Sequence, residues 1–273
     1  MDMREECMGI DVSAVKGVVM DMDGVLWRGD TPLPGLHEWI ALLRARGIPF
    51  ALATNNSRLT QLDYVHKLEH LGVKDVSEAQ IITSGTTTVD YIKRRYAAGS
   101  LIHVLGGDGL RADLRRAGYT VTGELDPNVR AVTVGLDFEL TYDKLKWASL
   151  CLQAGADFIA TNSDATFPMG DGLVPGAGSI VAALQTASGR EPLVMGKPHP
   201  PMFAAAIGVL ETKREHTLMI GDRLDTDIAG AKAAGLMTAL VLTGVSTREQ
   251  AAAAAVPPDA IYEGLPEMIA AWE

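Results

Sequence analysis

Short apolar runs alternate with stretches of helical periodicity along most of the chain. The first run, Gly17-Val-Val-Met-Asp21, predicts a buried strand. Apolar positions over 36–43 then recur at the i, i+3, i+4, i+7 spacing of an amphipathic helix. A second apolar run covers 48–53, and a second helical pattern covers 62–68. This alternation predicts parallel strands joined by helical crossovers.

The same alternation continues to the end of the chain and predicts a Rossmann-like parallel α/β sheet as the fold class. The alanine run 251–255 is expected to lie in a helix. The remaining strands are expected at 101–105, 131–134, 156–160, 193–195, 217–221 and 237–242, and helices near 86–97, 107–117, 141–154 and 176–188.

The chain offers two soft domain boundaries, Thr83-Ser-Gly85 and Gly189-Arg-Glu-Pro192. If the chain crosses between domains at both, the middle third is an inserted α/β domain. Residues 1–82 and 192–273 then form the core, and residues 83–191 form the insertion. The alternative is that the middle third adds strands to the core sheet.

Composition and charge exclude several classes of protein. Hydrophobic residues make up 47% of the 273 residues and charged residues 21%, which is typical of a globular protein. A net charge of −10 disfavours nucleic-acid binding. No apolar run is long enough to span a bilayer and the N-terminus has no signal-peptide pattern, so we expect a soluble, cytoplasmic protein. Cys7 and Cys151 are expected to be unpaired, and a homodimer is compatible with the sequence.

The clearest candidate chemistry lies where the first predicted strand ends. Asp21 and Asp23 are two residues apart and Gly24 follows them, so both carboxylates can approach one centre. In parallel sheets, ligands bind beyond the carboxyl ends of the strands. Mg²⁺ prefers oxygen ligands and usually binds one or two carboxylates together with substrate phosphate. Taken alone, however, this motif is equally well explained as a solvated acidic turn.

Polar groups at three further predicted strand ends favour the functional explanation. Each of them alone has an ordinary explanation, as a capping turn, a solvated lysine or an acidic helix start. Together they supply a hydroxyl, amides, an ammonium group and a further carboxylate, which is a complete set for phosphoryl transfer through an aspartyl phosphate. These groups are Thr54, Asn55 and Asn56 after 48–53, Lys197 after 193–195, and Asp222 after 217–221.

The order of these residues resembles the four motifs of the haloacid dehalogenase superfamily of phosphohydrolases. Over nearly the whole chain, the sequence is similar to the nitrophenylphosphatase-like, or NagD-type, branch. That resemblance implies a haloacid dehalogenase-like core with an inserted α/β cap of type IIA. The further matching motifs are Gly24-Val-Leu-Trp-Arg-Gly29, Ala53-Thr-Asn-Asn-Ser57, Gly106-Gly-Asp-Gly-Leu110, Val134-Gly-Leu-Asp137, Ala160-Thr-Asn-Ser-Asp164 and Gly196-Lys-Pro198.

The resemblance also implies a role for each motif residue. Asp21 is the expected nucleophile and a ligand of Mg²⁺. Asp23 is the expected general acid and base, and its backbone carbonyl binds the metal. Asp222 is the expected second carboxylate ligand, and Asp225 or Asp227 supports the site from outside. The expected phosphate-binding residues are Thr54, Asn55, Asn56 and Lys197.

The leaving group is expected to be selected by the inserted domain, with Asn162, Asp164 and Phe167 as candidate selectors. The expected partner is a small phosphate monoester, and pyridoxal phosphate, phosphoglycolate, sugar phosphates and nucleoside monophosphates all remain open. Asp23 argues against a dehalogenase. In that reaction no alkoxide leaves, so a second carboxylate that protonates the leaving group is not needed. A phosphonatase would use a lysine such as Lys144 or Lys146. A phosphotransferase or mutase, or a non-catalytic protein that binds a phosphometabolite, remains an alternative.

Overall fold

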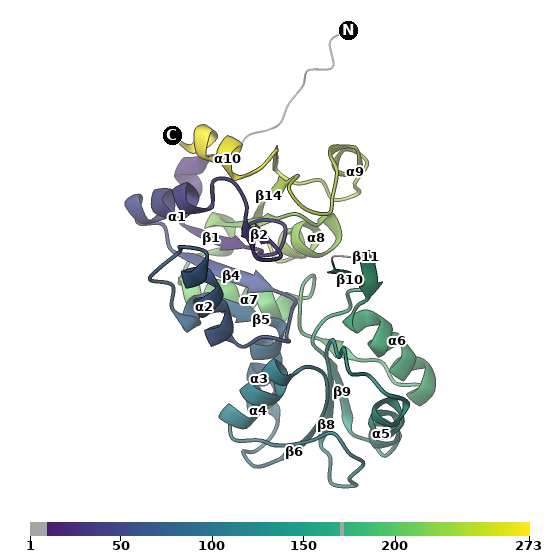
Figure 1. Ribbon diagram of the computed structural model, residues 1–273. Coiled ribbons are helices and arrows are strands. Elements are labelled where there is room, and N and C mark those ends of the chain that lie inside the picture. Colours follow the sequence, from purple (N-terminus) through teal and green to yellow (C-terminus); the bar gives the residue numbers. More distant parts are fainter. Residues whose placement is uncertain (1–9, 170–171) are drawn as a thin grey trace. The chain divides into compact units, whose positions relative to one another are not determined.

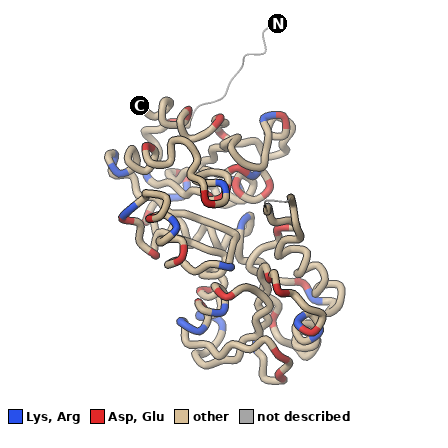
Figure 2. Tube along the Cα trace, in the orientation of Figure 1, with Lys and Arg blue, Asp and Glu red and all other residues tan. Residues whose placement is uncertain are grey.

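The computed structural model describes residues 10–169 and 172–273, which fold as two compact units (Figure 1). The first unit contains residues 10–54, Tyr64–Ile82 and Lys197–Glu273. The second contains Asn55–Asp63 and Thr83–Gly196. Acidic and basic residues are interspersed along the trace of each unit (Figure 2).

The first unit is built on a six-stranded sheet of order β15-β14-β13-β1-β4-β5. Strand β1 pairs in parallel with β13 on one side and with β4 on the other. The carboxyl ends of these three strands therefore lie next to one another at one edge of the sheet. The strands are β1 (Gly17–Met20), β4 (Phe50–Thr54), β5 (Ile81–Thr83), β13 (Thr217–Gly221), β14 (Met237–Val241) and β15 (Ala260–Tyr262).

Helices cover both faces of this sheet, because alternate residues of each strand point to opposite sides. Val18 and Met20 belong to one buried cluster with residues of α1 and α10, whereas Val19 belongs to another with residues of α7 and α8. A short hairpin, β2 (Trp27–Arg28) and β3 (Thr31–Pro32), follows β1. The helices are α1 (Leu36–Ala45), α2 (Gln61–His70), α7 (Pro200–Leu210), α8 (Ala229–Ala233), α9 (Arg248–Ala252) and α10 (Leu265–Trp272).

The second unit has a parallel sheet of its own, with strand order β12-β9-β8-β6-β7. Helices α5 and α6 pack on one face and α3 and α4 on the other, around two separate apolar clusters. The antiparallel hairpin β10 (Thr166–Met169) and β11 (Gly172–Pro175) precedes α6. The other elements are β6 (Leu101–Leu105), β7 (Thr120–Thr122), β8 (Ala131–Val134), β9 (Asp157–Ala160), β12 (Leu193–Val194), α3 (Ser84–Arg95), α4 (Asp108–Arg116), α5 (Tyr142–Gln153) and α6 (Ala177–Ser188).

The predicted parallel α/β fold class is confirmed, and the two sheets share no strand. The alternative in which the middle third extends the core sheet is therefore wrong. We expected boundaries at 82/83 and 191/192. The compact units divide at 82/83 and at 196/197, because β12 pairs with β9 of the second sheet. Residues 55–63 also belong to the second unit, which the periodicity did not indicate.

Several local expectations need correction. Helix α9 ends at Ala252, so most of the alanine run 251–255 lies outside a helix. Short strands such as β5, β7 and β15 escaped prediction because three residues carry too little periodicity. Cys151 is buried and unpaired, while Cys7 lies outside the described residues. Among the described helices, none is long and apolar enough to cross a membrane.

Because each unit has its own apolar clusters, the first unit should fold without the second. Replacing residues 83–196 with a short Gly-Ser linker is expected to leave a chain with a cooperative thermal transition followed by circular dichroism. The intact chain is the reference. A truncated chain that melts without any cooperative transition would show that the first unit depends on the second for its fold.

Candidate active site

Three of the predicted site residues lie at neighbouring strand ends of the first unit. Asp21 follows β1 directly, Thr54 is the last residue of β4, and Asp222 follows β13. Since β1 lies between the other two strands, the sheet alone brings these side chains to one edge. All three residues are buried.

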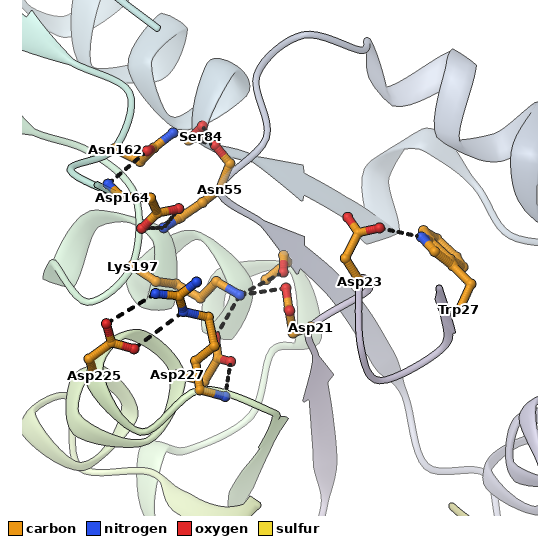
Figure 3. Close-up of polar contacts among 12 residues, drawn as sticks. Asp21, Asp23, Trp27, Asn55, Ser84, Asn162, Asp164, Lys197, Asp225 and Asp227 are labelled. Carbon is orange, nitrogen blue, oxygen red and sulfur yellow. Dashed lines mark hydrogen bonds and ion pairs between the residues drawn. The ribbon is translucent and has the colours of Figure 1, made fainter. Parts of the chain in front are cut away.

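Lys197 makes polar contacts with several groups at this edge of the sheet, as Figure 3 shows. Its Nζ donates hydrogen bonds to Asp21 Oδ1 at 2.6 Å and to the Ala53 carbonyl at 3.1 Å, and it lies 2.7 Å from Asp227 Oδ1. The Lys197 side chain is buried. Burial opposes its charge, but attraction to Asp21 and Asp227 outweighs that effect and raises the lysine pKa. Lys197 is therefore a fixed positive charge at this site.

Three buried carboxylates surround this single ammonium group. Oxygens of Asp21, Asp222 and Asp227 all lie within 4.8 Å of one another. Burial raises the pKa of Asp21. Burial, and then repulsion from Asp21 and Asp227, raises the pKa of Asp222 to about 8. Burial raises the pKa of Asp227 to about 6, against the attraction of Lys197. The cluster therefore needs either protons or a further cation.

The donor set fits a hard divalent cation. Asp222 Oδ2 accepts a hydrogen bond from the backbone N–H of Val245 at 2.8 Å, whereas its Oδ1 is buried without a hydrogen-bond partner among the described residues. A buried carboxylate oxygen of this kind is costly unless it binds a proton or a metal. Asp21 and Asp222 can therefore hold Mg²⁺ between them.

Asp227, and not Asp225, supports Lys197. The carboxylate of Asp227 also accepts a hydrogen bond from the backbone N–H of Arg223 at 3.1 Å. Asp225 is exposed and pairs with the Arg223 guanidinium at 3.2 Å (Figure 3). The difference arises because residues Leu224–Ile228 form a single π-helical turn, which places Asp227 inward.

Glycines make room for the two supporting carboxylates. A Cβ on Gly221 would lie 2.2 Å from the Asp227 Cβ, and one on Gly244 would lie 1.9 Å from Asp222 Oδ2. Gly24 has φ +86°, and a Cβ there would lie 2.6 Å from the same oxygen. Sequence reasoning missed Gly244, although it lies in the loop that follows the predicted strand 237–242. That position beyond a strand end was the available signal.

Asp23 lies apart from the buried cluster. Its side chain is exposed, and its Oδ1 accepts a hydrogen bond from the indole Nε1 of Trp27 at 2.9 Å (Figure 3). The protein atoms around the carboxyl group partly remove its hydration and so raise its pKa, and the attraction of Lys67 and the Trp27 hydrogen bond oppose that rise. We predicted Asp23 from its spacing, but gave no role to Trp27, which lies in the matching motif Gly24-Val-Leu-Trp-Arg-Gly29.

The remaining predicted residues form a network within the second unit. Asn55 Nδ2 donates to both carboxylate oxygens of Asp164 at 3.1 Å. The backbone carbonyl of Asn55 accepts hydrogen bonds from Asn162 Nδ2 at 2.7 Å and from Ser84 Oγ at 2.6 Å. Asn56 Oδ1 accepts one from the backbone N–H of Arg58 at 2.9 Å. The structure thus brings Asn55, Asn162 and Asp164 together (Figure 3).

Phe167, the third candidate selector, belongs to an aromatic group in the same unit. Its ring meets the ring of Phe138 edge to face, with centroids 5.8 Å apart. The Arg58 guanidinium lies 4.0 Å from the centroid of the Phe138 ring. Stacked arginines of this kind are common where proteins recognise planar or anionic groups.

Comparison with known proteins identifies the family of this chain. A family model described as haloacid dehalogenase-like hydrolase matches residues 18–120, and another described as HAD-hydrolase-like matches residues 194–268. The chain belongs to the haloacid dehalogenase-like hydrolase family.

Individual relatives resemble nearly the whole chain. The acid sugar phosphatase of Staphylococcus aureus is 36% identical over 258 residues, which are 94% of this chain and 98% of that protein. The 4-nitrophenylphosphatase of Thermotoga maritima has a TM-score of 0.90 and 35% identity, over 96% of this chain and 99% of that one. The glycerol phosphate phosphatase of Mycobacterium tuberculosis, solved in complex with magnesium, has a TM-score of 0.86 and 31% identity, over 94% of this chain and 77% of that one.

These relatives confirm the predicted resemblance to the nitrophenylphosphatase-like branch. All three are phosphatases, so the predicted class of phosphoric monoester hydrolase is confirmed as well.

The raised pKa of Asp222 predicts how the metal-free protein responds to pH. The folded protein keeps this proton up to about pH 8, whereas an unfolded chain loses it near an ordinary value of about 4. Because the folded state then binds more protons, its stability should fall as the pH rises from about 4 to about 8. Asp222→Asn has no such proton to lose. In chelator at pH 8, we expect it to melt roughly 3 °C or more above the unaltered protein.

The same experiment tests the metal site. Mg²⁺ should raise the melting temperature of the unaltered protein at pH 8 and should do little for Asp222→Asn. Asp225→Asn, which alters an exposed carboxylate outside the cluster, is the matched control and should respond to Mg²⁺ normally. If Asp222→Asn and the unaltered protein share one pH dependence and one response to Mg²⁺, the assignment of Asp222 is wrong.

Proposed function

We propose that this protein is a magnesium-dependent phosphatase that hydrolyses small phosphate monoesters through a phosphorylated Asp21. The observation that carries the proposal is the buried contact of 2.6 Å between Lys197 Nζ and Asp21 Oδ1 at the carboxyl end of β1. A carboxylate held in this way is oriented for attack, and the lysine beside it can neutralise an incoming phosphoryl group.

In the first step, an Asp21 oxygen attacks phosphorus and the bond between phosphorus and the ester oxygen breaks. Asp23 gives its proton to that leaving oxygen, so an alcohol departs and not an alkoxide. In the second step, Asp23 takes a proton from water, which attacks phosphorus. Phosphate leaves and the Asp21 carboxylate is restored. Atoms and charges balance over the two steps, and Asp23 ends in its initial protonated form.

Lys197 and Thr54 serve the phosphoryl group in both steps. The Lys197 ammonium offers hydrogen bonds to phosphoryl oxygens, and the Thr54 hydroxyl at the end of β4 offers another. Asp227 keeps Lys197 in place by pairing with it at 2.7 Å. We extend the phosphate-binding set to Asn55 and Asn56, the residues that follow Thr54 along the chain.

Mg²⁺ is the cofactor that this donor set suits best, with Asp21, Asp222 and the backbone carbonyl of Asp23 as its protein ligands. When bound, it supplies positive charge that lowers the repulsion between the carboxylates and the phosphate. Asp222 Oδ1 has no hydrogen-bond partner over residues 10–169 and 172–273, and the pKa of that carboxyl group is raised; both observations support this assignment. The magnesium complex of the Mycobacterium tuberculosis phosphatase supports it independently.

The second unit is the part that we propose as the cap, which selects the leaving group. It has its own sheet and core, and it carries Asn162, Asp164 and Phe167 as candidate selectors. The acid sugar phosphatase and the glycerol phosphate phosphatase both carry polyhydroxylated substrates in their names. We therefore place phosphates of sugars and related polyols first among the substrate candidates.

Asp21→Asn tests the function most simply, because it removes the nucleophile and leaves the side-chain volume almost unchanged. Turnover of phosphate monoesters should fall by at least about 10³-fold, since catalysis without the covalent step retains only binding and electrostatic contributions. Asp225→Asn is the control and should keep its activity, because Asp225 lies outside the buried cluster. Activity of the Asp21→Asn protein within a few-fold of the unaltered enzyme, with deamidation excluded by mass spectrometry, would refute the proposal.

A further inference from the structure

The indole of Trp27 contacts the exposed carboxylate of Asp23. Trp27 lies four residues further along the chain, at the start of β2, and its Nε1 donates to Asp23 Oδ1 at 2.9 Å (Figure 3). Among the described residues, no other group donates a hydrogen bond to the side-chain carboxylate of Asp23. The two partners differ sharply in burial, because Trp27 is 0% exposed whereas Asp23 is open to solvent.

Packing on several sides holds the indole in place. The ring of Tyr64 stacks near it, with centroids 6.5 Å apart and an angle of 19° between the planes. The Lys67 ammonium lies 4.8 Å from the centroid of the Trp27 ring and donates a hydrogen bond to the Gly29 carbonyl at 2.8 Å. The Trp27 carbonyl accepts a bond of 2.8 Å from the Gly24 N–H, which closes the turn that carries Asp23. Trp27 is therefore a fixed donor.

An exposed aspartate without such a donor would sample several side-chain rotamers. Proton transfer to a leaving oxygen requires one of them, with the acidic oxygen within hydrogen-bond reach of that oxygen. The indole N–H stabilises only the rotamers in which Oδ1 faces Trp27, because only in those can it donate its hydrogen bond to the carboxylate. This selection costs little at the moment of reaction, because burial has already fixed the indole.

The direction of the hydrogen bond also favours one oxygen of Asp23 as the one that carries the proton. An indole N–H is a donor only, so Asp23 Oδ1 must act as the acceptor in this contact. In a protonated carboxyl group the carbonyl oxygen is the stronger acceptor, so the contact with Trp27 favours the form of Asp23 that carries its proton on Oδ2. Oδ2 is therefore the atom that gives the proton to the leaving oxygen and later takes one from water.

We propose that Trp27 is a positioning residue that holds Asp23 with Oδ2 free for proton transfer to and from the leaving group. The proposal rests on the proposed function, in which Asp23 is the general acid and base. Trp27 itself touches neither the substrate nor the metal in this account, and it moves no proton.

The leaving group separates this role from a structural one. Nitrophenolate leaves without a proton, whereas an alkoxide needs one, so misplacing Asp23 should affect alkyl phosphates far more. Trp27→Phe keeps an aromatic ring but removes the N–H. We expect kcat/KM for ethyl phosphate to fall about ten-fold more than kcat/KM for 4-nitrophenyl phosphate, with the loss mainly in kcat, which corresponds to the loss of one hydrogen bond.

Trp39→Phe is the matched control. Trp39 is also buried in the first unit, and its indole Nε1 contacts Met20 Sδ at 3.2 Å, not a carboxylate. Both variants should lose some thermal stability, but only Trp27→Phe should change the ratio of the two substrates. An unchanged ratio in a folded Trp27→Phe protein would overturn the proposal.

Two further measurements keep the result decisive. In an Asp23→Asn background, Trp27→Phe should change the ratio little further, because the group it positions is already lost. In the Asp23→Ala protein, the resonance of the Trp27 indole N–H should shift relative to the unaltered protein, and this N–H should exchange faster with solvent. If neither change occurs, the proposal fails. This test remains available even if Trp27→Phe does not fold. If Asp23→Asn shows no dependence on the leaving group at all, the acid role in the proposed function is wrong instead.

Discussion

The buried pair of Lys197 and Asp21 is the interaction on which the rest of the site depends. One ammonium group lies among three buried carboxylates, Asp21, Asp222 and Asp227, so the cluster carries excess negative charge when all are ionised. Burying ionised groups is expensive unless each is paired and hydrogen-bonded. Asp227 pairs with Lys197, whereas Asp222 Oδ1 has no hydrogen-bond partner in the part of the chain that the structure describes. That imbalance is what makes the site suited to a cation and a phosphate together.

The fold supplies this cluster by simple means. Strands β13, β1 and β4 are neighbours, so residues at their carboxyl ends meet without any special loop. Chain connectivity adds a second constraint. The chain leaves the first unit directly after Thr54, returns for Tyr64–Ile82, and returns for the last time at Lys197. Thr54 and Lys197, two of the residues that we assign to the phosphoryl group, thus lie where the chain passes from one unit to the other.

Much of this could be predicted from the sequence, for physical reasons. Apolar runs marked the central strands, and the residues that follow them, Asp21, Thr54 and Asp222, are fixed by chain direction alone. Other features depend on tertiary structure. Whether Asp225 or Asp227 faces Lys197 depends on one π-helical turn, which no periodicity indicates. The pairing of β12 with the second sheet depends on a partner strand more than 30 residues away. The Trp27 contact depends on a tight turn between β1 and β2.

The central claim is that Asp21 itself becomes phosphorylated. An aspartyl phosphate is an acyl phosphate, which borohydride reduces to the alcohol homoserine, and the site of reduction can be found by mass spectrometry of peptides. The Asp23→Asn variant should accumulate the intermediate with 4-nitrophenyl phosphate, because its second step lacks a base. The account predicts homoserine at position 21, dependent on both substrate and Mg²⁺. Release of nitrophenol with no reduction at position 21, or with reduction at another carboxylate, would contradict it.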